Sequence, residues 1–142
     1  MVSKAILVFL SSWIIQNTEF SKIIDDPIFF KVTKKEMSDK ACFSSKICRV
    51  KAYYIKNEGI FLIDELKPNN DICDQSIVLH EMIHHYQKNH DKKIDLDDRT
   101  LWTLQERQAI FYQNLFLLQA KAKNNNRGPE NILQCEGGTY LD

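Results

Sequence analysis

The pattern that most constrains this chain is a pair of histidines, four residues apart, inside an apolar run. Residues 76–87 read SIVLHEMIHHYQ. Apolar residues on both sides of the histidines are typical of a helix that is buried over most of its surface. Because residues i and i+4 lie above one another on a helix, His80 and His84 are expected to share one face. The segment therefore predicts a buried helix with two imidazoles directed at a common point.

The residue types in this pattern point to metal chemistry. Neutral imidazole nitrogen is a common zinc ligand, and H-E-x-x-H is the spacing at which two histidines of a helix hold the ion. Glu81 lies about 100° around the helix from His80, where its carboxylate reaches a metal-bound water without binding the metal. The metal lowers the pKa of that water, and the carboxylate accepts its proton. We expect one Zn²⁺ per chain, held by His80 and His84, with Glu81 as the general base.

A second segment, residues 104–113, extends this pattern and reads LQERQAIFYQ. Together the two segments resemble the zincin metallopeptidases, most closely their compact gluzincin type and the small uncharacterised zincin-like domains of bacteria. In gluzincins the third ligand is a glutamate on the following helix, often within E-x-x-A, and Glu106 with Ala109 fits that pattern. The resemblance covers about residues 49–120. It implies that Glu106 is the third ligand and that the chain hydrolyses peptide bonds of a peptide or protein substrate.

Other side chains compete with Glu106 for the third position. His90 fits the longer spacing of metzincins, H-E-x-x-H-x-x-G-x-x-H, but Gln87 occupies the position that needs glycine. On a continued helix His90 is about 240° away from the metal face. No methionine follows Met82 to form the Met-turn of that class. A weaker set of rivals is acidic and comes from a charged loop: Asp95, Asp97 and Asp98.

One part of the gluzincin apparatus has no assigned residue, namely the distal His or Tyr that stabilises the oxyanion. Tyr112 and His85 are nearby aromatics that we interpret as packing groups or as groups behind the ligands. The alternative function is therefore a catalytically weak or inactive zincin-like domain that binds zinc or a protein partner. A chance motif in a helical protein is the third reading. The presence of Glu81 favours a hydrolase, because a structural zinc site needs no base.

The rest of the chain predicts a small α+β domain. Thr33 with Glu36 has the capping-box spacing of a helix start, and Gly59 supplies a hairpin turn. The expected order begins with an N-terminal helix ending by 25–27, a strand at 28–32, a short helix, and a hairpin of 49–55 and 60–63. An active-site helix follows, opened by Asp74 or Ser76 and running to about 89, and then a long helix at 100–122. This is a zincin-like architecture with a small antiparallel sheet. We expect one domain at 1–123 and a polar tail at 124–142.

The first sixteen residues are mostly apolar and read MVSKAILVFLSSWIIQ. No small-x-small cleavage site follows them, and Ile6, Leu10 and Trp13 share one helical face. A core helix is therefore favoured over a signal peptide. The run is too short and too interrupted to span a bilayer. The compartment stays open between cytoplasmic and exported.

The cysteines and the charge limit the partners and the compartment further. Four cysteines, at 42, 48, 73 and 135, contain no C-x-x-C pair. They form two disulfides if the chain is exported, in one of three connectivities, or remain thiols. A further hypothesis makes Cys135 an inhibitory fourth zinc ligand. Lys plus Arg equals Asp plus Glu at 19 each, so the charge gives no reason to expect nucleic acid or an anionic membrane as a partner. The sequence does not indicate an oligomeric state.

Overall fold

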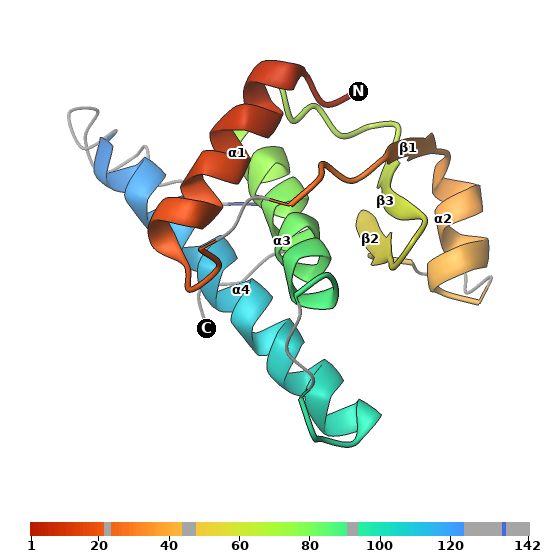
Figure 1. Ribbon diagram of the computed structural model, residues 1–142. Helices are drawn as coiled ribbons and strands as arrows, with labels where there is room; N and C mark the ends of the chain where they lie inside the picture. The colour runs from red at the N-terminus through yellow and green to blue at the C-terminus, as the bar shows by residue number, and fades with distance from the viewer. Residues whose placement is uncertain (22–23, 44–47, 91–93, 124–134, 136–142) are drawn as a thin grey trace.

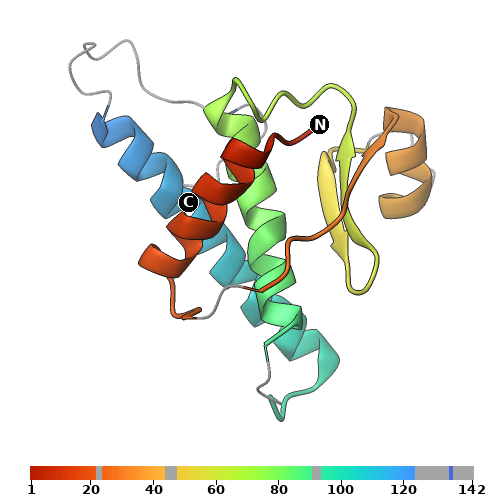
Figure 2. The same ribbon diagram turned by 45° about the horizontal axis from the view of Figure 1, so that its top comes forward.

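The computed structural model describes residues 1–21, 24–43, 48–90, 94–123 and 135. Its elements are α1 (Lys4–Asn17), β1 (Phe29–Val32), α2 (Lys34–Ala41), β2 (Ala52–Ile55), β3 (Gly59–Ile63), α3 (Ile72–Lys88) and α4 (Asp98–Lys123). This order confirms the expected α+β class. Figure 1 shows α1, α3 and α4 gathered on one side of the sheet and α2 on the other, and Figure 2 shows the same layers from a second direction.

The sheet has three strands in the order β1-β3-β2 and is mixed. The hairpin is antiparallel, with Tyr54 opposite Ile60, as expected. The expectation of a purely antiparallel sheet is wrong for β1, which pairs in parallel with β3 through Phe29 opposite Ile60. Gly59 is needed at the junction, because its φ is 142° and a Cβ there would collide with the Ile28 carbonyl oxygen.

The N-terminal segment forms α1, which packs on the core. Ser3 caps its start by accepting the Ile6 N–H at 3.2 Å. The helix ends at Asn17, earlier than the expected boundary at 25–27, because the backbone of Thr18 is extended. Both the N–H and the hydroxyl of Thr18 donate to the Ile14 carbonyl oxygen and cap this end. None of the described helices combines the length and the apolar composition that crossing a membrane requires.

The core positions α3 at the centre of the molecule. Four of its apolar side chains are fully buried between the sheet, α1 and α4, and they are Val78, Leu79, Met82 and Ile83. Each such side chain contributes about 1.5–3 kcal/mol. A second apolar cluster, with Met37 and Phe61, fills the space between α2 and the other face of the sheet. Since α3 is fixed on several sides, its histidines are held on a rigid element.

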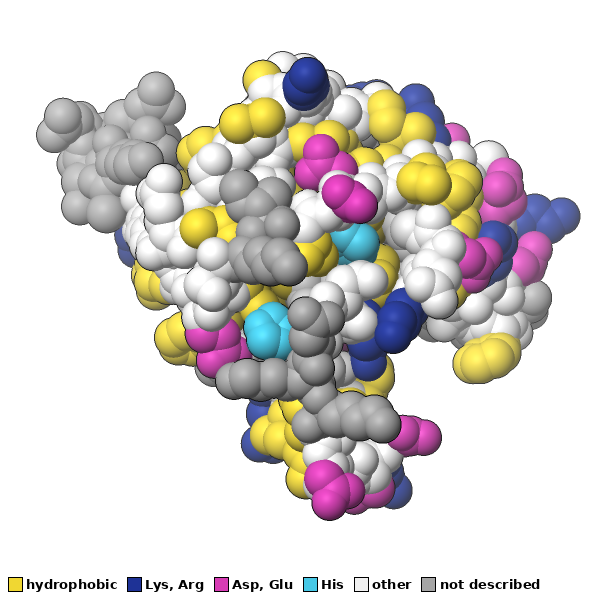
Figure 3. Space-filling view, viewed as in Figure 1, with side chains coloured by type: hydrophobic (Ala, Val, Ile, Leu, Met, Phe, Trp, Pro, Cys, Tyr) yellow, Lys and Arg dark blue, Asp and Glu magenta, His cyan; other side chains and the backbone are white. Residues whose placement is uncertain are grey.

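All four cysteines form disulfides in the structure. The pairs are Cys42–Cys48 and Cys73–Cys135. The hypothesis that Cys135 is a zinc ligand is wrong, because its sulfur is bonded to Cys73. Apart from Cys135, the tail at 124–142 lies outside the described residues. On the face shown in Figure 3, basic side chains are interspersed with acidic ones and form no large area of one sign.

Candidate metal centre

Helix α3 carries the two histidines and begins earlier than the sequence predicted. The carboxylate of Asp71 caps it by accepting the Asp74 N–H at 3.0 Å. Asp74 in turn accepts the Lys67 N–H at 2.7 Å, which joins the preceding loop to the first turn. The helix therefore starts at Ile72, whereas Asp74 or Ser76 was the expected opening residue. Seventeen residues without a break put His80 and His84 on one face.

Helix α4 brings the third side chain to the same place. Its start is fixed by Asp97, whose two carboxylate oxygens accept the N–H and the hydroxyl of Thr100 at 2.9 and 2.7 Å. Glu106 lies further along the helix, on the side that faces α3. Ala109, one turn beyond it, is 0% exposed. A small side chain at this position lets the two helices approach closely, as the E-x-x-A pattern implies.

The three predicted ligands converge. His80 Nε2 and His84 Nε2 lie 3.2 Å apart. Each is 3.0 Å from a different carboxylate oxygen of Glu106. At ordinary zinc–ligand distances, two corners of a tetrahedral site are separated by about 3.3 Å. Two imidazole nitrogens and one carboxylate oxygen, all within 4.8 Å of one another, could hold a divalent metal ion such as zinc.

The rival ligands lie elsewhere. Within the described part of the chain, His80, His84 and Glu106 form the one group of metal-binding side chains close enough to hold an ion. The ring of His90 packs against Phe20, with 5.9 Å between their centroids. Asp97 is engaged in capping α4. The structure therefore brings together the residues chosen from the sequence.

The electrostatics of the three side chains are coupled. Burial by itself raises the pKa of Glu106, but hydrogen bonds with His80 and His84 outweigh it and hold that pKa well below its usual range. Burial lowers the pKa of His80, and its interactions with Glu106 and Glu81 outweigh burial, so the pKa of His80 is raised. The site is thus a place where positive charge is stabilised by carboxylates.

Glu81 lies beside the ligands without joining them. Its side chain is buried, and burial raises the pKa of its carboxyl group against the opposing effect of His80 and His84. The backbone N–H of Tyr54, on strand β2, donates a hydrogen bond to the carboxylate. A buried carboxylate next to a metal-binding group, and outside it, has the placement expected of a general base.

Two glutamines behind the histidines were missed by the sequence reasoning. Gln113, which is 1% exposed, places its Oε1 2.8 Å from His80 Nδ1. Gln87 places its Oε1 2.8 Å from His84 Nδ1. Spacing could have identified them, because Gln113 is two helical turns after Glu106 and Gln87 is one turn after His84. Groups that hold the second nitrogen of a metal-binding histidine orient its ring.

Comparison with known families identifies the family of the chain but gives no activity. A family model described as a domain of unknown function, DUF6647, matches residues 1–125. The chain belongs to the DUF6647 family. The matched segment spans every helix and strand of the described structure and all four site residues. Comparisons with curated proteins and with solved structures give no match.

The two aromatics noted near the motif have packing and tethering contacts in this DUF6647 domain. His85 Nδ1 is 3.1 Å from the Tyr54 hydroxyl, and its Nε2 is 2.7 Å from the Asp25 carbonyl oxygen. These contacts tie α3 to β2 and to the connector before β1. Tyr112 packs edge-on against Trp13 at 6.5 Å.

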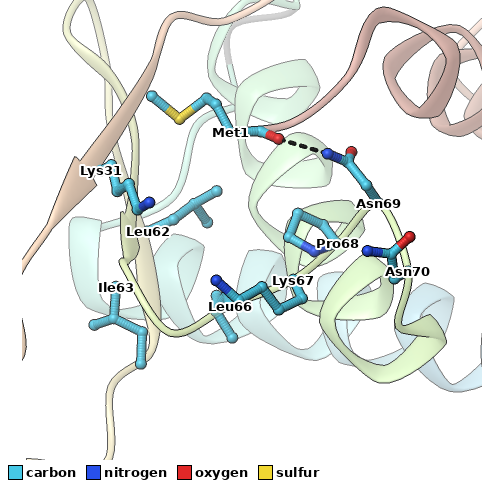
Figure 4. A pocket seen from close by; sticks show the side chains of 9 residues that line it. All are labelled: Met1, Lys31, Leu62, Ile63, Leu66, Lys67, Pro68, Asn69 and Asn70. Carbon is cyan, nitrogen blue, oxygen red and sulfur yellow. Dashed lines mark hydrogen bonds between the residues drawn. The ribbon is translucent and has the colours of Figure 1, made fainter.

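Figure 4 shows a small pocket lined by residues other than the candidate metal ligands. It has a volume of about 80 Å³ and lies between the N-terminal residues and the loop before α3, with Lys31 and Lys67 at its wall. Asn69 donates to the Met1 carbonyl at 2.8 Å and accepts the Ser3 N–H at 2.8 Å, which fixes the chain there. A volume of this size holds only a few water molecules, and none of the four site residues lines the pocket.

Proposed function

We propose that this DUF6647 domain is a zinc-dependent hydrolase of peptide bonds. The observation that carries the proposal is the convergence of His80, His84 and Glu106 at 3.0–3.2 Å, with Glu81 buried beside them. This donor set leaves a coordination position open for water, as catalytic zinc sites do. The zincin resemblance of the two helical segments supports the same reading.

In the proposed mechanism, the metal ion and the side chains of the protein have separate roles. When bound, zinc supplies Lewis acidity and lowers the pKa of water. Glu81 takes the proton of the attacking water and returns it to the leaving nitrogen. Burial raises the pKa of Glu81 towards the working pH, which suits a group that must first accept and then donate a proton. The Tyr54 N–H holds the carboxylate in position for both steps.

The disulfides bear on where this activity takes place. Disulfides persist in oxidising compartments and are rare in the cytosol. The pairs Cys42–Cys48 and Cys73–Cys135 therefore support an exported location over a cytoplasmic one. Intact mass before and after reduction and alkylation, on protein from its native source, tests this. Four alkylatable thiols in the non-reduced protein would contradict it.

The function is tested with purified full-length protein, its metal content and one substitution. We expect about one zinc per chain by elemental analysis, and zinc-dependent cleavage of an unfolded protein such as casein. Glu81→Gln should retain the zinc and lose activity by about 10²–10⁴-fold. Glu65→Gln is the control, because Glu65 is an exposed residue that pairs with Lys34 on α2.

Each outcome separates the competing functions. Zinc binding without hydrolysis by the wild type would favour the zinc- or protein-binding domain. Absence of zinc, even after reconstitution, would leave the motif as a chance match. Full activity of Glu81→Gln would refute the assigned base even if the protein is a zinc enzyme.

A further inference from the structure

We infer that Gln113 and Gln87 are positioning residues that fix the tautomers of His80 and His84, so that both present Nε2 to the metal. The part of this inference that concerns zinc rests on the proposed function. The part that concerns tautomers is a property of the metal-free chain. The hydrogen-bond partners of each glutamine amide decide which of its ends faces the imidazole.

The orientation of Gln113 follows from a chain of buried hydrogen bonds. The hydroxyl of Ser76 donates to the Cys73 carbonyl oxygen at 2.6 Å. Its proton is thereby committed, because a carbonyl oxygen can only accept. The Ser76 oxygen accepts from Gln113 Nε2 at 3.2 Å. The Oε1 of Gln113 therefore faces His80 Nδ1, which must carry a proton in order to donate to it.

Gln87 is oriented by partners on the other helix. Its Nε2 lies 2.9 Å from the Gln105 carbonyl oxygen and 2.7 Å from the Oε1 of Gln108. A backbone carbonyl accepts only, so this end of the amide is the nitrogen. The Oε1 of Gln87 then faces His84 Nδ1 at 2.8 Å. His84, like His80, must donate from Nδ1.

The hydrogen bonds from His80 and His84 Nδ1 to the two glutamines oppose the effect of Glu106 on the tautomers. A carboxylate oxygen lies 3.0 Å from each Nε2 and attracts a proton to that nitrogen. In a neutral imidazole only one nitrogen is protonated, so a proton on Nε2 would remove the lone pair that zinc needs. The glutamine Oε1 atoms favour the proton on Nδ1. Each Nε2 then keeps a free lone pair, next to the Glu106 carboxylate that would share the metal.

Histidine tautomers can be read directly by long-range ¹H–¹⁵N correlation spectra. The sample is the metal-free full-length protein, at a pH where titration shows both imidazoles to be neutral. We expect the wild type to have protonated Nδ1 and unprotonated Nε2 in both His80 and His84. A proton on Nε2 of either residue in the neutral wild type would overturn the inference without any variant.

Substitutions then test the effect of each glutamine on the tautomer of its histidine. Gln113→Met removes the acceptor at similar length. It should move the proton of His80 to Nε2, leave His84 unchanged, and weaken zinc binding by about 10–100-fold. Gln87→Met should do the same for His84. Gln113→Glu keeps an acceptor for His80 Nδ1, so it should keep the wild-type tautomer even if overall stability changes.

Gln119→Met is the matched control on the same helix. Gln119 accepts the Trp13 indole N–H at 2.8 Å and donates to Asn17 at 3.0 Å, away from the histidines. It should change neither the tautomers nor zinc affinity. Wild-type tautomer and affinity in Gln113→Met would overturn the inference. Predicted tautomers together with zinc binding but no hydrolysis would support it, and would overturn only the proposed enzyme.

Discussion

The backbone N–H of Tyr54 donates a hydrogen bond to the carboxylate of Glu81, so the edge strand β2 and the helix α3 meet at the candidate base. Among the contacts that set the pKa of Glu81, this bond and the nearby His80 and His84 favour the charged form. Burial opposes them and is the largest effect, so the pKa of this carboxyl group is raised. The ionised form of Glu81 therefore lowers the free energy of unfolding.

This effect predicts that Glu81→Gln stabilises the metal-free protein at neutral pH. The folded pKa of Glu81 is above its unfolded value near 4.5, so the wild type loses stability as pH rises from that value through the folded pKa. The amide avoids this loss, and its Oε1 can still accept the Tyr54 N–H. We therefore expect Glu81→Gln to be the more stable protein at neutral pH, and the gain to disappear at acidic pH.

The measurement is urea denaturation of both metal-free proteins at acidic and at neutral pH. The two should have similar stability below about pH 4.5, where Glu81 is protonated in both the folded and the unfolded state. A difference that is constant across the pH range would show that ionisation of Glu81 is not its cause.

The pair His80–Glu106 predicts a pH window of stability in the metal-free protein. The pKa of Glu106 is lowered from 4.5, so its contribution is present above that value and is lost as pH falls through the folded pKa. The pKa of His80 is raised from 6.5, so its contribution is complete below that value and is lost as pH rises through the folded pKa. Both contributions coexist between about pH 4.5 and 6.5.

Comparison with Glu106→Gln tests this window, because an amide cannot form the charged pair. The stability lost on substitution should be largest inside the window and smaller on either side, measured by denaturation in the presence of a chelator. A loss that keeps growing from pH 6.5 to 9 would contradict the assignment.

The identity of the third ligand predicts opposite results for two variants. Glu106→Ala removes a side chain that lies 3.0 Å from both histidine nitrogens. It should weaken zinc binding by more than about 100-fold, beyond the effect of losing a residue behind a ligand. His90→Ala should change affinity little, because that ring packs against Phe20. Competition titration with a chromophoric chelator measures both. A reversed order would exclude the gluzincin assignment.

The features that the sequence predicted correctly are local. The capping box of α2 needs only Thr33 and Glu36, three residues apart, and both of its bonds are present. The shared face of His80 and His84 needs only one helical turn. Glu106 was reached through a known pattern that spans two helices, and the structure places its carboxylate 3.0 Å from the Nε2 atoms of His80 and His84.

The features that escaped prediction depend on long-range packing. Nothing near β1 in the sequence specifies that it pairs in parallel with β3. The order of the cysteines does not distinguish Cys73–Cys135 from the other possible pairs. The orientation of Gln113 follows from its contact with Ser76, 37 residues away on another helix. Each of these requires the packed structure, since propensity and periodicity describe one element at a time.

The two disulfides predict unequal losses of stability. Cross-linking stabilises a fold mainly by restricting the unfolded chain, and the effect grows with the length of the closed loop. Cys73–Cys135 closes a separation of 62 residues and Cys42–Cys48 closes one of 6. The loop-entropy relation gives about 4 kcal/mol for the long loop and about 2 kcal/mol for the short one. The two losses are measured by denaturation of two double variants, Cys73→Ser/Cys135→Ser and Cys42→Ser/Cys48→Ser. A larger loss of stability from removing the short-loop disulfide would contradict this ranking.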